Sequence, residues 1–116
     1  MARISYVELP VKQVGETRDF YAKAFGWSFT DFGPDYAATT GGDVDLGING
    51  SDDQAIAQLL PIVEVEDLEA ALDKVVAAGG EVTVPIFAYP GGRRFHFRDP
   101  AGNILGVFVN EPEGHE

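Results

Sequence analysis

The segment Tyr6-Val7-Glu8-Leu9-Pro10-Val11 recurs 54 positions later as Leu60-Pro61-Ile62-Val63-Glu64-Val65. Each copy alternates β-forming residues and is followed by a helical pattern that ends at glycine, which indicates a strand and then a helix. A short apolar strand centred on glycine then closes each half, at Gly47 and at Gly106. A repeat of this length predicts two copies of one supersecondary unit.

The helical patterns cover residues 16–25 and 68–78, and Asp67 stands at the N-cap position of the second. The expected strands are residues 4–11, 27–32, 36–40 and 44–48 in the first half, and 56–65, 81–87, 93–98 and 104–109 in the second. Each half is therefore βαβββ. Because one such unit leaves a sheet face uncovered, we expect an α+β fold in which two modules form a curved, open mixed-sheet barrel with a central cleft.

The chain has 116 residues, which suits a single domain, residues 1–116. We expect module one at 3–50, module two at 55–110 and a frayed acidic tail at 111–116. The absence of cysteine excludes disulfides and thiolate metal sites. A formal net charge of −11 argues against nucleic-acid and membrane partners. With no signal-peptide pattern and no long apolar run, the expected location is cytoplasmic.

Three short motifs carry a family resemblance: Asp19-Phe20-Tyr21, Phe25-Gly26-Trp27 and Asp99-Pro100-Ala101-Gly102-Asn103. With the repeat, they make residues 4–109 resemble the vicinal oxygen chelate superfamily, which includes glyoxalase I, extradiol dioxygenases, and bleomycin- and fosfomycin-resistance proteins. The resemblance implies the barrel fold and a homodimer. From their residue types we interpret Phe20 and Tyr21 as core and helix-packing residues and the third motif as a turn.

In metal-dependent members of that superfamily, the ligands lie on the first and fourth strands of each module. The resemblance places these positions at Tyr6, Leu60, Gly47 and Gly106, none of which is a usual metal ligand. A shifted alignment would bring Asp45 in, but Asp45 alone cannot make a site. We therefore expect no metal ligands and no cofactor, with a divalent metal as the alternative.

Strand alternation suggests which side chains line the cleft. Phe95 and Phe97 are expected to face the helix, which leaves Arg94 and His96 on the cleft side; fosfomycin-resistance members also have a ligand contact at the His96 position. The predicted ligand-binding residues are Tyr6, Glu8, Trp27, Tyr36, Gly47, Leu60, Arg94, His96 and Gly106. The glycines at the strand centres suggest that a planar ligand approaches the backbone closely.

These residues support more than one function. The first hypothesis is a binding protein that holds a small planar or cationic molecule in the cleft without a metal, as bleomycin-resistance members bind a drug. The alternative is a lyase or dioxygenase-type enzyme with a non-standard metal or none, in which Glu8, His96 and Tyr6 act as acid–base groups, with Glu8 and His96 the catalytic candidates. A third is a partner subunit whose cleft is covered by another chain. Whether the chain is an enzyme stays open.

Overall fold

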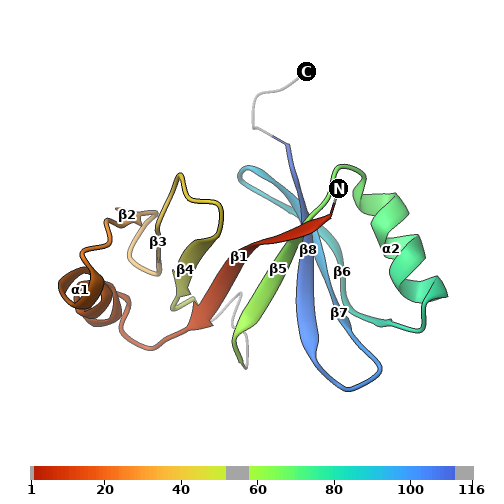
Figure 1. Cartoon of the computed structure of the whole chain (residues 1–116), viewed down its shortest axis with the longest axis horizontal. Helices are drawn as coiled ribbons and strands as arrows, with labels where there is room; N and C mark the ends of the chain where they lie inside the picture. Colours follow the sequence, from red (N-terminus) through yellow and green to blue (C-terminus); the bar gives the residue numbers. More distant parts are fainter. Residues whose placement is uncertain (1, 52–57, 112–116) are drawn as a thin grey trace. The chain divides into compact units, whose positions relative to one another are not determined.

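The structure is a computed structural model that describes residues 2–51 and 58–111. It divides into an N-terminal unit, residues 5–60, and a C-terminal unit, residues 1–4 and 61–116. In chain order the elements are β1 (Arg3–Pro10), α1 (Val14–Phe25), β2 (Thr30–Asp31), β3 (Tyr36–Ala38), β4 (Asp45–Asn49), β5 (Leu60–Glu64), α2 (Leu68–Ala77), β6 (Glu81–Tyr89), β7 (Gly92–Arg98) and β8 (Ile104–Asn110) (Figure 1). The predicted βαβββ order is confirmed in both halves.

The two units have the same strand topology. In the N-terminal unit the order is β2-β3-β4-β1, and in the C-terminal unit it is β5-β8-β7-β6. The first strand of each half pairs in parallel with the fourth, and the other pairs are antiparallel. Glu8 lies opposite Gly47, as Ile62 lies opposite Gly106. The sequence repeat is therefore also a repeat of register.

The core of the N-terminal unit lies between α1 and one face of its strands. Val14, Ala37 and Ile48 are buried there, and Val11 and Phe29 pack against them. This face carries Ile48, which leaves its neighbours Gly47 and Asn49 on the opposite face, because side chains alternate along a strand.

The core of the C-terminal unit lies under α2, which runs alongside β6, β7 and β8 (Figure 1). Leu68, Phe95, Val107 and Val109 form its buried cluster, and Phe97 packs against them. The prediction that the two phenylalanines of β7 face the helix is confirmed. Among residues 2–51 and 58–111, no helix is long and apolar enough to cross a membrane.

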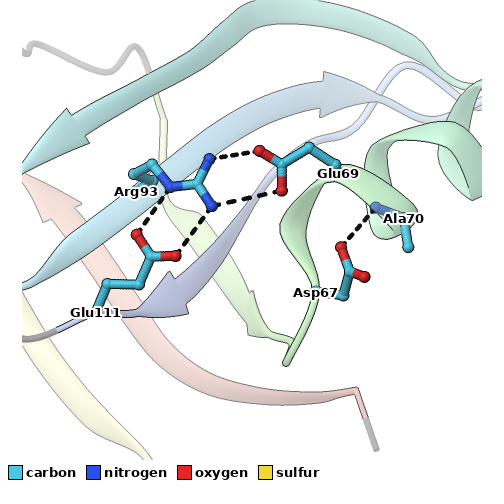
Figure 2. A network of polar contacts seen from close by, with 5 residues as sticks. All are labelled: Asp67, Glu69, Ala70, Arg93 and Glu111. Atoms are coloured by element: carbon cyan, nitrogen blue, oxygen red, sulfur yellow. Dashed lines mark hydrogen bonds and ion pairs between the residues drawn. The ribbon is translucent and has the colours of Figure 1, made fainter. Parts of the chain in front are cut away.

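The predicted helix ends are also confirmed. Asp67 caps α2, since its Oδ1 accepts the Ala70 N–H at 3.0 Å (Figure 2). Gly26 ends α1 with φ 75°, in the left-handed region that favours glycine, and donates its N–H to the Ala22 carbonyl. The Asp99 carboxylate accepts the backbone N–H groups of Ala101 and Asn103, both at 2.9 Å, and closes the predicted turn.

The expectation that Phe20 and Tyr21 lie in the core is wrong, although Tyr21 packs against aromatic side chains on and after its own helix. Phe20 is 61% exposed and Tyr21 is half-buried, and Val14 is the buried residue of α1. Trp27 stacks on Tyr21 with ring centroids 5.7 Å apart and lies 5.0 Å from Phe25. The strand expected at residues 27–32 forms only over the two residues of β2.

Glu111, the first residue of the expected frayed tail, is held by hydrogen bonds. Glu111 donates its backbone N–H to the Gly91 carbonyl at 2.9 Å, and its carboxylate accepts hydrogen bonds from Arg93 at 2.8 and 3.0 Å. The same guanidinium donates to Glu69 in the first turn of α2, at 2.5 Å (Figure 2). Arg93 thus joins the end of β8 to the start of α2. Residues 112–116, and residues 56–57 of the expected fifth strand, lie outside the described part.

Candidate functional site

Four polar side chains of the N-terminal unit meet on the sheet face opposite α1. Tyr6 and Glu8 come from β1, Tyr36 from β3 and Asn49 from β4. The Tyr6 and Tyr36 hydroxyl oxygens lie 2.5 Å apart, and the Tyr36 hydroxyl donates to Glu8 Oε2 at 2.9 Å. Asn49 Nδ2 donates to Glu8 Oε1 at 3.3 Å. We call these four residues the tyrosine–glutamate cluster.

The Glu8 carboxylate is the centre of the cluster and is only 2% exposed. A buried charge is stable only where donors face it, and Tyr36 and Asn49 supply one to each carboxylate oxygen. The Asn49 amide is itself held in place, because its Oδ1 accepts the Ser51 N–H at 2.8 Å and so directs the NH₂ group toward Glu8. The carboxylate is therefore fixed in position before any ligand arrives.

The space in front of Gly47 is filled by the chain itself. A Cβ atom at this position would overlap both tyrosine hydroxyls and would lie 2.8 Å from Cε2 of Tyr6. The prediction that Gly47 lets a planar ligand approach the backbone is therefore wrong. Glycine is needed here because Tyr6 and Tyr36 cross the strand at this point.

The Tyr36 hydroxyl is hydrogen-bonded both to the Tyr6 hydroxyl and to the Glu8 carboxylate. Burial raises the pKa of Tyr36 well above its usual value of 10.0, and the nearby Glu8 charge and Tyr6 raise it further. Its hydroxyl therefore stays protonated at physiological pH. In this state it donates to Glu8 and accepts from Tyr6.

The residues at the superfamily's metal positions do not fit a metal. Leu60 is an aliphatic side chain that is 1% exposed, and Gly47 has the tyrosine hydroxyls where a carboxylate would extend. Asp45, the candidate from a shifted register, closes the loop before β4, since it accepts hydrogen bonds from Thr39 Oγ1 and the Gly42 N–H. Within residues 2–51 and 58–111, no three His, Cys, Asp or Glu side chains are grouped to hold an ion.

The C-terminal unit has a different set of side chains on the equivalent face. Arg94 and His96 lie on β7 opposite Phe108 and Gly106, and both are buried, at 7% and 8% exposure. The Arg94 guanidinium lies 5.4 Å from the ring centre of Phe87 and 5.5 Å from that of Tyr89. These distances are typical of cation–π contacts.

The strand registers show which positions of the N-terminal and C-terminal units are equivalent. Tyr36 pairs with Asn49, two residues after Gly47, and Arg94 pairs with the residue two after Gly106. By the same registers His96 corresponds to Ala38. The duplicated frame therefore carries an acidic, tyrosine-rich face in one unit and a cationic, aromatic-lined face in the other.

The structure brings together only some of the predicted site residues. Tyr6, Glu8, Tyr36 and Gly47 meet in the N-terminal unit, and Arg94, His96 and Gly106 lie on one face of the C-terminal unit. Trp27 is placed with the aromatic side chains of α1.

Sequence reasoning missed Asn49, Phe87 and Tyr89. Asn49 lies just past the strand expected at residues 44–48, although its position two residues after Gly47 puts it on the same face. Tyr89 lies past the strand expected at residues 81–87, whereas β6 continues through it.

Comparison with known proteins agrees with the fold and the repeat. The family model described as Glyoxalase/Bleomycin resistance protein/Dioxygenase superfamily matches residues 3–107. Proteins of Mycobacterium bovis and Mycobacterium tuberculosis, each named "Putative glyoxylase CFP32", are 30% identical over 90% of this chain. The chain spans 44% of the length of these relatives.

Two solved structures share the fold. A glyoxalase/bleomycin resistance protein/dioxygenase superfamily member from Vibrio splendidus superimposes with a TM-score of 0.71 at 17% identity, over 96% of this chain and all of the other. The hypothetical protein BH1468 from Bacillus halodurans gives 0.76 at 12% identity, over 99% of both chains. The chain belongs to the glyoxalase/bleomycin resistance protein/dioxygenase superfamily.

Proposed function

We propose that this chain binds a small molecule without a metal ion, and that the tyrosine–glutamate cluster is its recognition site. The observation that carries the proposal is the buried Glu8 carboxylate, held by Tyr36 and Asn49. Burial of a carboxylate costs free energy of folding, so a buried carboxylate that is held by hydrogen bonds favours a recognition role. Tyr6 and Tyr36 are half-buried, so neither residue is fully enclosed.

The proposal that binding needs no metal rests on the side chains at the superfamily's metal positions. The superfamily's metal positions carry one side-chain oxygen, the phenol of Tyr6, and that oxygen is already hydrogen-bonded to Tyr36. A catalytic ion normally takes three protein ligands. In place of the ion, the site offers a hydrogen-bonding surface made of phenols and a carboxylate.

Binding of small aromatic fragments to protein stripped of metal with a chelator tests this proposal. Backbone amide NMR shifts are expected to change at Glu8, Ala38 and Gly47, and Glu8→Gln is expected to abolish these changes. Glu81→Gln is the matched control, because Glu81 is an exposed glutamate on β6 that pairs with Arg98 at 2.8 Å. The proposal is wrong if no fragment shifts these amides, or if shifts appear only after a divalent metal is added.

The acid–base alternative stays a prediction. Of its three residues, Tyr6 and Glu8 are joined through Tyr36, and this chain of hydrogen bonds supports proton transfer between them. His96 belongs to β7 of the C-terminal unit. Turnover of a bound fragment that is lost in Tyr6→Phe, while binding is retained, would favour the enzyme over the binding protein.

Homodimer formation and a cytoplasmic location also stay predictions. The exposed rings of Phe20, Phe25 and Trp27 on and after α1 support association through that helix, since clustered apolar surface marks contact sites. Sedimentation equilibrium tests the dimer directly, and a monomer at all concentrations would contradict it.

A further inference from the structure

A group of aromatic side chains lies on the surface of the N-terminal unit, on α1 and just after it. Phe20 and Phe25 are each 61% exposed, and Trp27 is 43% exposed. The half-buried Tyr21 joins them, since its ring stacks on those of Phe25 and Trp27 at centroid distances of 6.3 and 5.7 Å. Phe20 meets the same tyrosine edge-on at 5.1 Å. Because contiguous apolar surface marks a contact site, we expect these four residues, the α1 aromatic patch, to be covered by another surface.

The exposed side of α1 also carries two complementary pairs of side chains. Asp19 and Lys23 are four residues apart, which puts them on one side of the helix, and both are exposed. Phe20 and Ala24 each follow one of them by one residue and form the neighbouring row of the exposed surface. One row therefore holds an anion and a cation, and the other holds a large and a small side chain.

These two rows are self-complementary when two α1 helices lie antiparallel. A two-fold axis midway between the helices brings Phe20 of each copy against Ala24 of the other. The same axis brings Asp19 of each copy within about one helical turn of Lys23 of the other. A parallel pair of helices would instead place Asp19 against Asp19 and Lys23 against Lys23. The charges thus favour the antiparallel pair.

Two strands at the ends of the strand orders are poorly suited to association. β2 has only two residues. β6 has Pro85 near its centre, and its register with β7 shifts between Val82 and Val84 and again between Val84 and Phe87. Short strands, proline and irregular register all hinder pairing with a further strand. Association through β2 or β6 is therefore disfavoured relative to association through α1.

We propose that a second copy of this chain covers the α1 aromatic patch, in an antiparallel contact that packs Phe20 on Ala24 and pairs Asp19 with Lys23. This inference rests on the predicted homodimer and adds its interface. Taking about 200 Å² for an aromatic residue, the three exposed rings offer roughly 300–400 Å² per copy. A standard interface buries about 800 Å² per partner, so the residues beside the patch must also contribute. The dimer is therefore expected to dissociate on dilution.

Sedimentation velocity over a range of protein concentrations measures the dissociation constant of the dimer. Moderate salt screens the net charge of −11 on each copy, which would otherwise oppose association. Phe20→Ala is expected to weaken the dimer at least about tenfold, because aromatic side chains dominate interface energetics. Phe32→Ala is the matched control, since Phe32 is 57% exposed in the same unit but lies outside α1. Circular dichroism checks that both variants are folded.

Exchange of the two charges tests the antiparallel register. Lys23→Asp brings two anions together in each contact and Asp19→Lys brings two cations together, so each variant alone is expected to be mainly monomeric. An equimolar mixture of the two is expected to restore the dimer, because every contact then joins an anion to a cation. A wild-type dimer that these variants leave unchanged, or that their mixture does not restore, would overturn this inference and leave the predicted homodimer standing. A wild type that is monomeric at every concentration would overturn both.

Discussion

The hydroxyl oxygens of Tyr6 and Tyr36 lie 2.5 Å apart, in the space where a side chain at position 47 would begin. Two phenols from different strands thus occupy the place where the family resemblance predicts a metal-binding carboxylate. The position is glycine because the tyrosines need the volume. This relationship links the fold of the N-terminal unit to its candidate chemistry.

Gly47→Ala is expected to destabilise the chain. The added methyl group overlaps both hydroxyls, and overpacking of this kind costs about 1–3 kcal/mol. Urea unfolding followed by circular dichroism measures the loss. Gly15→Ala is the matched control, because a Cβ there meets Arg18 Nη2 at an ordinary 3.6 Å and lies in α1, where alanine is favoured. Equal stability of both variants and the wild type would contradict the packing at Gly47.

Tyr36 is expected to make the chain sensitive to alkali. Its folded pKa is raised above the unfolded value of 10.0, so the unfolded state loses its proton first as the pH rises. Stability contributed by this group is therefore complete below pH 10 and falls above it. Melting temperatures measured from pH 8 to 11 are expected to fall more steeply for the wild type than for Tyr36→Phe. Parallel curves for the wild type and Tyr36→Phe would show that the pKa of Tyr36 is not raised in the folded state.

The Asp67 cap of α2 is expected to contribute measurably to stability. Asp67→Ala removes the acceptor for the Ala70 N–H, and loss of such a cap costs about 1 kcal/mol. Asp73→Ala changes an exposed aspartate within the same helix and is expected to be neutral or slightly stabilising. Chemical denaturation compares the two variants, and an equal effect would argue against the cap.

The Arg93 ion-pair network is expected to weaken in acid. The hydrogen bond from Arg93 lowers the pKa of Glu69 below its usual value of 4.5. A depressed folded pKa means that the contribution is present above pH 4.5 and is lost as the pH falls through the folded pKa. At pH 7 the wild type is expected to have a higher melting temperature than Glu69→Gln. This difference in melting temperature is expected to disappear toward pH 3. Molar salt is expected to shrink the difference at pH 7, since the pair is exposed.

The fold could be predicted from the sequence because the repeat combined several independent signals. Alternation defined the strands, glycine ended α1, and Asp67 marked the start of α2. The interpretation failed where a residue type was treated as sufficient for burial. Phe20 is apolar, but the helix face that reaches the core carries Val14 instead, and apolar side chains are common on surfaces.

Part of the candidate site could also be predicted from the sequence pattern. Strand alternation placed Tyr6 and Glu8 on one face, and the registers agree. It gave no information on how far side chains reach, so it assigned the space at Gly47 to a ligand rather than to Tyr6 and Tyr36. Contacts between strands, such as that of Asn49 with Glu8, depend on register and rotamer and are not visible in a single sequence.

The proposed binding of a ligand to the tyrosine–glutamate cluster requires no metal ion. Isothermal titration of the wild-type chain with benzamidinium, a planar cationic probe, in excess chelator and again with excess zinc, is the decisive measurement. We expect the same dissociation constant in both conditions, and loss of binding in Glu8→Gln. Binding that appears only with zinc, or that survives Glu8→Gln unchanged, would contradict it.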